Sequence, residues 1–232
     1  MQIIKDLEQD TQDWHTLRRG KITGTKLESV MGTPLARVSL ISELISEAGT
    51  EQSAMIKPTV EMERGSEEEW FGLKMFEQIT DKKIEKHGAW ISDRYDWLMC
   101  SPDGPIPDKN GKVTEAVEIK SPHSKTAIFY RMVNMIPQDE LGLSKSKVNI
   151  CGVSPDYIWQ VVNYFLVNTD LQTLYFGVYD VRFIDDKEKL YIVEVKRTDP
   201  VLQKLMSEAD VALQKFREDW LKWQAIILPT NF

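Results

Sequence analysis

Asp103, Glu118 and Lys120 have the residue types and spacing of a site that could hydrolyse phosphodiesters. Asp103 follows the apolar run 98–101, and the other two residues lie in a second strand-like run, 116–120. Because side chains alternate along a strand, Glu118 and Lys120 would point to the same face. If the two runs pair, Asp103 comes to lie beside that face, and two carboxylates and an ammonium group converge on one spot.

Two neighbouring carboxylates suit Mg²⁺, which prefers oxygen ligands and keeps several of its waters. A bound metal polarises a phosphoryl oxygen and lowers the pKa of a bound water. The lysine could orient that water or stabilise the developing charge. The same three residues would also fit a β-hairpin that carries an exposed cross-strand salt bridge, so their pattern alone leaves both interpretations open.

The residues around this triplet resemble those of a known family. The string Cys-Ser-Pro-Asp-Gly at 100–104, with Glu-Ile-Lys-Ser-Pro at 118–122, resembles the core of the phage lambda exonuclease and YqaJ-type viral recombinase family, a branch of the PD-(D/E)xK nucleases. The resemblance extends to three further blocks, in the family's order: residues 14–25, Arg64-Gly65, and Gln160 with Tyr164. Together the blocks run from about residue 14 to 168 and are far more specific than the triplet.

The resemblance implies a role for each residue of the triplet and for two others. Asp103, Glu118 and Lys120 match the family's catalytic residues. The metal ligands would be Asp103, Glu118 and the backbone carbonyl of Ile119, with Glu69 acting indirectly or through a water. The expected cofactor is Mg²⁺, for which Mn²⁺ would substitute.

Glu69 has a second interpretation that needs no metal. In the expected helix 67–79 it shares one face with Leu73 and Phe76, and a glutamate on an apolar face indicates a buried partner such as a metal. However, Ser66-x-x-Glu69 also matches a capping box, in which the glutamate bonds to the start of its own helix. The resemblance favours the metal, and the capping box remains the alternative.

A second group of residues is expected to hold the 5′-phosphate of DNA. In the resembling family an arginine at the position of Arg18 and a hydroxyl at that of Thr25 bind this phosphate, and Ser101 and Gln160 can add neutral donors. A helix N-terminus beside an arginine suits an anion. The alternative is a surface arginine and an ordinary helix cap. Trp14 is expected to face the core.

The order of the expected elements predicts an α/β fold with a restriction-endonuclease-like core, in which a central mixed β-sheet is flanked by helices. We expect one domain over residues 1–232. Helices are expected at 10–19, 26–31, 40–48, 67–79, 123–133, 155–168 and 199–227. Strands are expected at 88–91, 97–101, 116–120, 171–179 and 190–195, and loops at 49–58 and 136–150. Lys145 and Lys147 in the second loop could approach DNA or simply be solvated.

Composition narrows the class of protein. The chain has 232 residues, 42% of them hydrophobic, and a net charge of −7, which excludes a uniformly basic surface but permits a local basic channel. No apolar run is long enough to span a bilayer, and the N-terminus does not resemble a signal peptide, so a soluble cytoplasmic protein of a bacterial host is expected. Its two cysteines, Cys100 and Cys151, cannot supply a four-thiolate iron–sulfur site, and a disulfide between them is not expected.

The function that the resemblance implies is metal-dependent digestion of one strand of linear double-stranded DNA from its 5′ end. The product would be a 3′ overhang for a single-strand annealing protein of a phage recombination system. The resemblance also implies a homotrimeric ring threaded by DNA. Two alternatives stay open: a restriction-like endonuclease on the same core, and a non-catalytic DNA-binding phage protein that keeps the fold.

Overall fold

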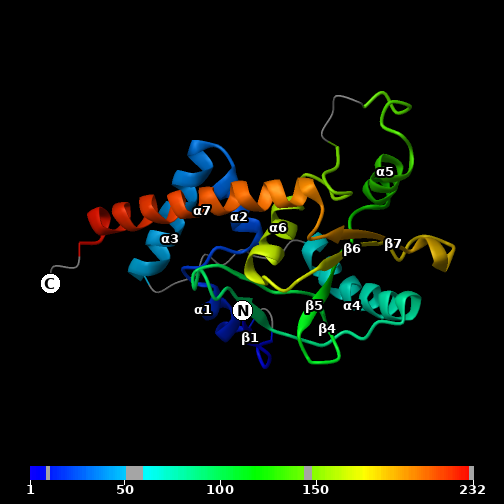
Figure 1. Cartoon of the computed structure of the whole chain (residues 1–232), viewed down its shortest axis with the longest axis horizontal. Helices are drawn as coiled ribbons and strands as arrows, with labels where there is room; N and C mark the ends of the chain where they lie inside the picture. The colour runs from blue at the N-terminus through cyan, green and yellow to red at the C-terminus, as the bar shows by residue number, and fades with distance from the viewer. Residues whose placement is uncertain (9–10, 51–59, 144–147, 230–232) are drawn as a thin grey trace.

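The structure is a computed structural model that describes residues 1–8, 11–50, 60–143 and 148–229. Two β-sheets form its centre (Figure 1). The four-stranded sheet has the order β4–β5–β6–β7 and is mixed, because β5 and β6 run parallel whereas the outer pairs are antiparallel. Its strands are β4 (Gly104–Pro107), β5 (Val113–Lys120), β6 (Thr173–Tyr179) and β7 (Leu190–Lys196).

The smaller sheet is antiparallel, and helices surround both sheets. Its strands are β1 (Gln2–Ile4), β2 (Ala89–Ile91) and β3 (Met99–Cys100). The helices are α1 (Gln12–Arg18), α2 (Gly24–Met31), α3 (Pro34–Thr50), α4 (Val60–Thr80), α5 (Ser124–Met135), α6 (Ile158–Val167) and α7 (Pro200–Ile227), with a short 3₁₀ helix at Asp186–Glu188. The expected mixed sheet flanked by helices is therefore confirmed.

The two faces of the four-stranded sheet pack against different helices, so that α4 and α7 lie on opposite sides of it (Figure 1). Val117 and Ile119 of β5 pack with Phe76 of α4. Ala116 and Phe176 point to the opposite face, where they join the large core to which α6 and α7 contribute. Because side chains alternate along β5, Glu118 and Lys120 lie on the α6 side, as their spacing predicts.

The strand that precedes Asp103 does not pair with β5, which corrects the sequence-based expectation. Cys100 of β3 pairs with Trp90 of β2 in the smaller sheet. The antiparallel partner of β5 is instead β4, which contains Pro105 and Pro107. Proline lacks the N–H that a central strand must donate, but β4 is an edge strand, where that loss is tolerated. The turn between β4 and β5 begins at Asp108, whose Oδ1 accepts hydrogen bonds from the backbone N–H groups of Asn110 and Lys112.

Several helices differ in extent from the expected ranges. Helix α4 begins at Val60, so Ser66 lies inside the helix and cannot cap it; the capping-box interpretation of Glu69 is wrong. Helix α3 is longer than expected and takes in Gly49 and Thr50, while the rest of the expected loop 49–58 lies outside the described residues. Helix α6 begins at Ile158, three residues later than expected.

The remaining expectations concern surfaces and loops. Residues 136–143 and 148–149 contain no helix or strand, as expected, but Lys145 and Lys147 lie outside the described residues, and their approach to DNA stays a prediction. Cys100 and Cys151 are both free thiols. No helix in the described ranges is long and apolar enough to cross a membrane.

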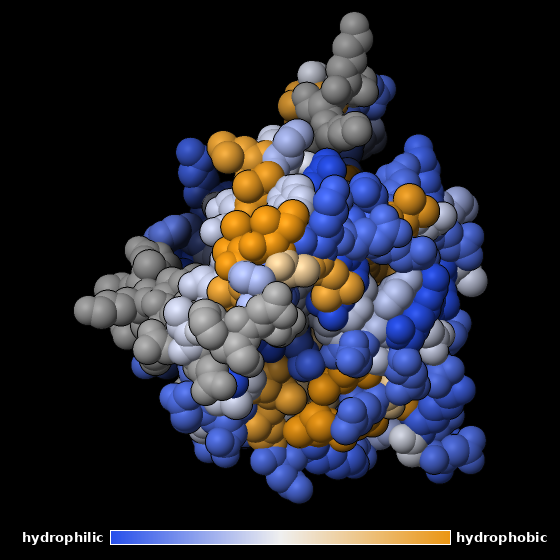
Figure 2. Space-filling view, turned by 90° about the vertical axis from the view of Figure 1, so that its left-hand side faces the viewer, coloured by the Kyte–Doolittle hydropathy of each residue, from blue (hydrophilic) through white to orange (hydrophobic). Residues whose placement is uncertain are grey.

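One end of the molecule exposes apolar side chains. Helices α3 and α7 form a groove there, lined by Val38, Ile41, Ile45, Trp223, Ile226 and Ile227. Figure 2 views this end and shows hydrophobic patches separated by hydrophilic surface. Exposed apolar patches of this kind often mark contact surfaces in proteins.

Candidate active site

The residues that the sequence singled out gather around one cavity at the end of β5. The cavity has a volume of about 200 Å³, and we call it the carboxylate cavity. Its lining includes every side chain predicted for the site: Arg18, Thr25, Glu69, Ser101, Asp103, Glu118, Lys120 and Gln160. These residues come from α1, α2, α4, α6, β5 and the segment between β3 and β4.

Asp103 is positioned by the β4–β5 ladder. Gly104 pairs with Val117, so Asp103 stands opposite Glu118. The Oδ2 atom of Asp103 accepts a hydrogen bond of 2.7 Å from the backbone N–H of Ile119, which extends the ladder by one step. The carboxylate therefore has one oxygen fixed to the strand.

Glu118 is buried, and three donors hold its carboxylate. Its Oε1 accepts hydrogen bonds from Lys120 Nζ at 2.6 Å and from Gln160 Nε2 at 2.5 Å. Its Oε2 accepts a hydrogen bond from the hydroxyl of Tyr164, which also contacts the carbonyl of Ser101 at 3.1 Å. A buried carboxylate is stable only when it is paired in this way, so these contacts fix its orientation.

Helix α6 supplies two of these donors because Gln160 and Tyr164 are four residues apart and share one helical face. Gly24 allows α2 to pack close to this face. A Cβ at Gly24 would lie 2.7 Å from Cγ of Gln160, which is closer than a side chain tolerates. The glycine thus brings the start of α2 next to Gln160 and Glu118.

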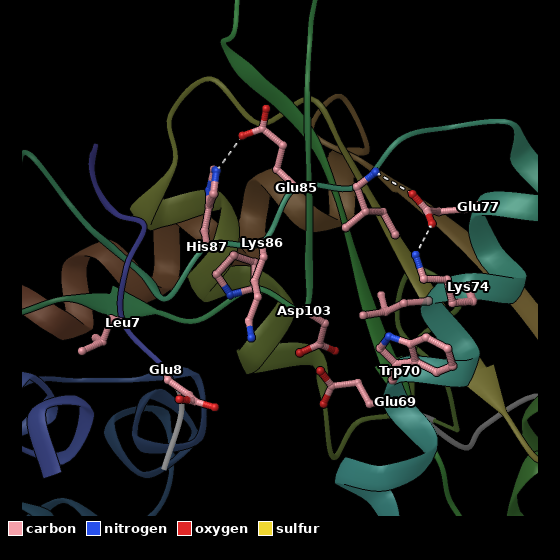
Figure 3. A pocket seen from close by; sticks show the side chains of 13 residues that line it. Leu7, Glu8, Glu69, Trp70, Lys74, Glu77, Glu85, Lys86, His87 and Asp103 are labelled. Carbon is pink, nitrogen blue, oxygen red and sulfur yellow. Dashed lines mark hydrogen bonds and ion pairs between the residues drawn. The ribbon is translucent and has the colours of Figure 1, made fainter. Parts of the chain in front are cut away.

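Glu69 reaches the cavity from α4, the helix on the other face of the sheet. Figure 3 shows its carboxylate and that of Asp103 pointing toward one another. Burial raises the pKa of Asp103 well above its usual value, and the negative charges of Glu118 and Glu69 raise it further. The carboxylates therefore repel one another, and a cation between them would relieve that repulsion.

Lys120 stays cationic despite its surroundings. Burial acts to lower the pKa of Lys120, but the charges of Glu118 and Asp103 outweigh burial and raise this pKa above its usual value. The ammonium group also lies 5.6 Å from the ring centroid of Tyr157, a cation–π distance. Lys120 is thus a fixed positive charge at the edge of the carboxylates.

The carboxylates fit a hard divalent cation. A carboxylate offers about four lone-pair sites. The three donors to Glu118 leave one such site on its Oε2. In Asp103 the hydrogen bond from Ile119 occupies a site on Oδ2 only. Among the described residues no three His, Cys, Asp or Glu side chains are close enough to hold a metal by themselves. Mg²⁺ does not need such a cage, because it is often bound by one or two carboxylates and several waters.

The other end of the cavity is suited to an anion. Thr23 occupies the N-cap position of α2, but its side chain makes no capping hydrogen bond to the helix. Thr25 lies in the first turn, with its hydroxyl 3.3 Å from that of Thr23. The buried hydroxyl of Ser101 has no hydrogen-bond partner in the described part of the chain. Arg18 lines the same space, so backbone N–H groups, a hydroxyl and a guanidinium surround it.

Two residues at the site were not predicted. Trp14, expected in the core, lines the cavity, and its ring lies 4.0 Å from the guanidinium carbon of Arg18. Tyr157 packs against Phe176 and under Lys120. Trp14 lies about one helical turn before Arg18, and Tyr157 lies about one helical turn before Gln160. That spacing was the signal that could have found them.

The chain was compared with known proteins. The model of the YqaJ-like viral recombinase domain matches residues 13–172. An alkaline exonuclease from Laribacter hongkongensis has a similar structure, with a TM-score of 0.68 and 24% sequence identity over 94% of this chain and 100% of that one. A crystal structure of the same exonuclease in complex with dAMP gives the same values.

A phage-related exonuclease from Haemophilus somnus 129PT is also similar, with a TM-score of 0.58 and 14% identity over 87% of this chain and 95% of that one. No curated protein matches the chain. At these levels of identity the solved structures show a shared fold.

The raised pKa of Asp103 predicts how stability depends on pH when no metal is present. Between the usual value of 3.8 and the higher folded pKa, the folded chain keeps a proton that the unfolded chain has lost. The free energy of unfolding should therefore fall as pH rises through this window, by at most about 1.4 kcal/mol per pH unit. Asp103 is partly exposed, so solvent screening will make the slope smaller. Asp103→Asn should remove this loss.

Urea denaturation in EDTA between pH 5 and 8 measures this effect. Asp103→Asn should gain stability over the wild type as pH rises. Asp108→Asn is the matched control, because hydrogen bonds from the backbone of Lys112 and Asn110 lower the pKa of Asp108. That variant should show no gain. If the wild type and Asp103→Asn keep a constant difference across this range, the carboxylates do not repel as described.

Proposed function

This chain belongs to the YqaJ-like viral recombinase family, and on that premise we propose that it is a metal-dependent exonuclease. It would degrade one strand of linear double-stranded DNA in the 5′-to-3′ direction and leave a 3′ overhang. The observation that carries this proposal is the meeting of Asp103, Glu118 and Lys120 with Arg18 around one cavity. The two solved relatives, which share the fold, are exonucleases, and one was crystallised with dAMP.

Asp103 and Glu118 would hold Mg²⁺ or Mn²⁺, with the carbonyl of Ile119 as a further ligand and Glu69 acting through water. When bound, the ion would polarise a phosphoryl oxygen and lower the pKa of a bound water. Tyr164 and Gln160 keep the carboxylate of Glu118 turned toward the cavity through their hydrogen bonds. The repulsion among the carboxylates favours a bound cation.

Lys120 would act as a charge and not as a base. Its raised pKa keeps it protonated, so it cannot accept a proton from water at neutral pH. Its ammonium group can donate to the attacking water and stabilise the negative charge that develops on the phosphate. Preorganised charge of this kind is commonly the largest contribution to catalysis.

The anion end of the cavity would bind the terminal 5′-phosphate. Such a phosphate carries more charge than an internal phosphodiester, and Arg18 can bind it with two parallel hydrogen bonds. Thr25, Ser101 and Gln160 would add neutral donors. Ser101 is two residues from Asp103, so a phosphate bound there is held at a short, set distance from the bond that is cut.

The first prediction of the proposed function tests the chemistry. Glu118→Gln keeps the shape of the side chain but loses its charge and should abolish cleavage. Lys120→Ala should lower the rate by about 10²- to 10³-fold, since one electrostatic contact at the reacting centre is worth that much. The measurement uses linear duplex labelled separately at its 5′ and 3′ ends, in Mg²⁺ or EDTA, with closed circular duplex alongside.

The matched control is Glu115→Gln, on the same strand but paired with Lys82 at 2.6 Å and away from the cavity. It should cleave normally. Near-normal turnover by Glu118→Gln would contradict the assignment. Cutting of the closed circle would instead identify an endonuclease, and binding without Mg²⁺-dependent cleavage would identify a non-catalytic DNA-binding protein.

The second prediction concerns the DNA end. Wild-type protein should degrade 5′-phosphorylated duplex faster than the 5′-hydroxyl form, and Arg18→Ala should erase most of this preference. Hydrogen bonds to charged groups contribute about 1.5–3 kcal/mol, which corresponds to roughly a ten- to hundredfold effect. Initial rates on both substrates measure it. Arg94→Ala serves as the control, because Arg94 is exposed and pairs with Asp210. Full discrimination by Arg18→Ala would place end recognition elsewhere.

A further prediction concerns assembly, in the cytoplasm of a bacterial host. We expect a homotrimeric ring around the DNA, which would explain how a chain of net charge −7 stays on its substrate. The expected partner is a single-strand annealing protein that takes up the 3′ overhang. Light scattering should give the mass of three chains plus that of the bound DNA, and a higher mass when such an annealing protein is added. A monomer mass under these conditions would contradict the ring.

A further inference from the structure

A second cavity opens on the other side of Asp103 and Glu69. It has a volume of about 490 Å³, within the range of about 300–1,000 Å³ typical of ligand sites. We call it the Trp70 cavity. It shares Asp103 and Glu69 with the carboxylate cavity, so the two spaces meet at these carboxylates. Figure 3 looks into it, with the two carboxylates at its centre.

The chemistry requires space on both sides of the carboxylates. A phosphodiester joins two nucleotides, and the reacting phosphorus lies between them. If the carboxylate cavity takes the 5′-terminal nucleotide, the following nucleotide must lie beyond the carboxylates. The Trp70 cavity is the space that the structure offers there.

One wall of the Trp70 cavity carries an exposed aromatic ring. Trp70 follows Glu69 on α4, and its side chain is 58% exposed, which is unusual for a tryptophan with no binding role. The ring of Phe71 is nearly perpendicular to the Trp70 ring, with 5.1 Å between centroids, and the ammonium group of Lys74 lies 5.9 Å from the Trp70 centroid. Leu73 and Ile84 add apolar surface beside it. An exposed ring with apolar neighbours suits a nucleobase, because every base has a face that can stack.

The opposite wall offers a cation. Glu85 on this wall pairs with Lys5 at 3.2 Å, and Glu8 also lines the cavity. Glu77 lies on α4 with Trp70 and pairs with Lys74 at 3.0 Å. Lys86 is exposed and makes no ion pair within the described ranges, and Figure 3 shows its amine pointing into the cavity. A phosphate at this end of the cavity would therefore meet the charge of Lys86, while Glu8, Glu69 and Asp103 add negative charge elsewhere in the lining.

We propose that the Trp70 cavity binds the second nucleotide of the 5′-ended strand, with its base stacked on Trp70 and its 3′-phosphate at Lys86. This inference rests on the proposed function, because it takes its strand direction from the 5′-phosphate site. It makes Trp70 and Lys86 substrate-binding residues on the side of the scissile bond that faces the rest of the duplex.

The test is a binding cycle between protein and DNA in EDTA, where no cleavage is needed. Fluorescence anisotropy measures affinity for 5′-phosphorylated duplex with either a normal or an abasic second nucleotide. Stacking of one base is worth about 1–3 kcal/mol, so the wild type should bind the normal duplex at least about fivefold more tightly. Trp70→Ala should bind both duplexes equally, and Trp70→Phe should recover part of the preference.

Two matched controls accompany these variants. Phe129→Ala removes an exposed aromatic side chain from α5, outside the cavity, and should keep the full preference for the normal base. Lys86→Ala should reduce the slope of log affinity against log salt by about one phosphate contact. Lys83→Ala, three residues away and not in the lining, should leave the slope unchanged.

The outcomes separate this inference from the proposed function. An equal preference for the normal base in Trp70→Ala and wild type, or no preference in the wild type, would overturn the stacking site. A normal binding cycle in a protein that fails to cleave in Mg²⁺ would support the subsite and reject the exonuclease. Absence of any DNA binding in EDTA would overturn the subsite, whereas the cleavage assay in Mg²⁺ decides the exonuclease separately.

Discussion

The burial of one carboxylate, that of Glu118, is the constraint around which the site is built. A carboxylate that is 2% exposed must be compensated by donors, because an isolated charge in the interior is very costly. Lys120 on its own strand supplies one donor, and Gln160 and Tyr164 on α6 supply the others. The requirement for these donors therefore ties α6 to β5, and with them the large core to the four-stranded sheet.

The burial of Glu118 also concentrates negative charge at this site, where neighbouring carboxylates repel one another and so lower the stability of the fold. Asp103 and Glu69 lie next to Glu118, and Lys120 offsets only part of their mutual repulsion. A domain without a ligand would be more stable with fewer charges here, since unbalanced buried charge weakens a fold. The arrangement fits the proposed cation, which would offset these charges when bound.

The charge of the whole chain and the charge of the site have to be considered separately. The net charge is −7, yet Arg18 and Lys120 bring two positive charges to one cavity, beside the start of α2. Steering and binding depend on such local distributions and not on the total. An acidic protein can thus present a phosphate site, provided that its basic groups converge as they do here.

The sequence by itself determined what lies within a single element. Alternation along β5 placed Glu118 and Lys120 on one face, helical spacing joined Gln160 to Tyr164, and the motif blocks indicated the family. Only the tertiary structure decided that β4 and not β3 pairs with β5, and that Glu69 arrives from the helix on the opposite face. The reason is that periodicity is local, whereas strand pairing and helix placement depend on hydrogen bonds and burial shared between segments distant in sequence.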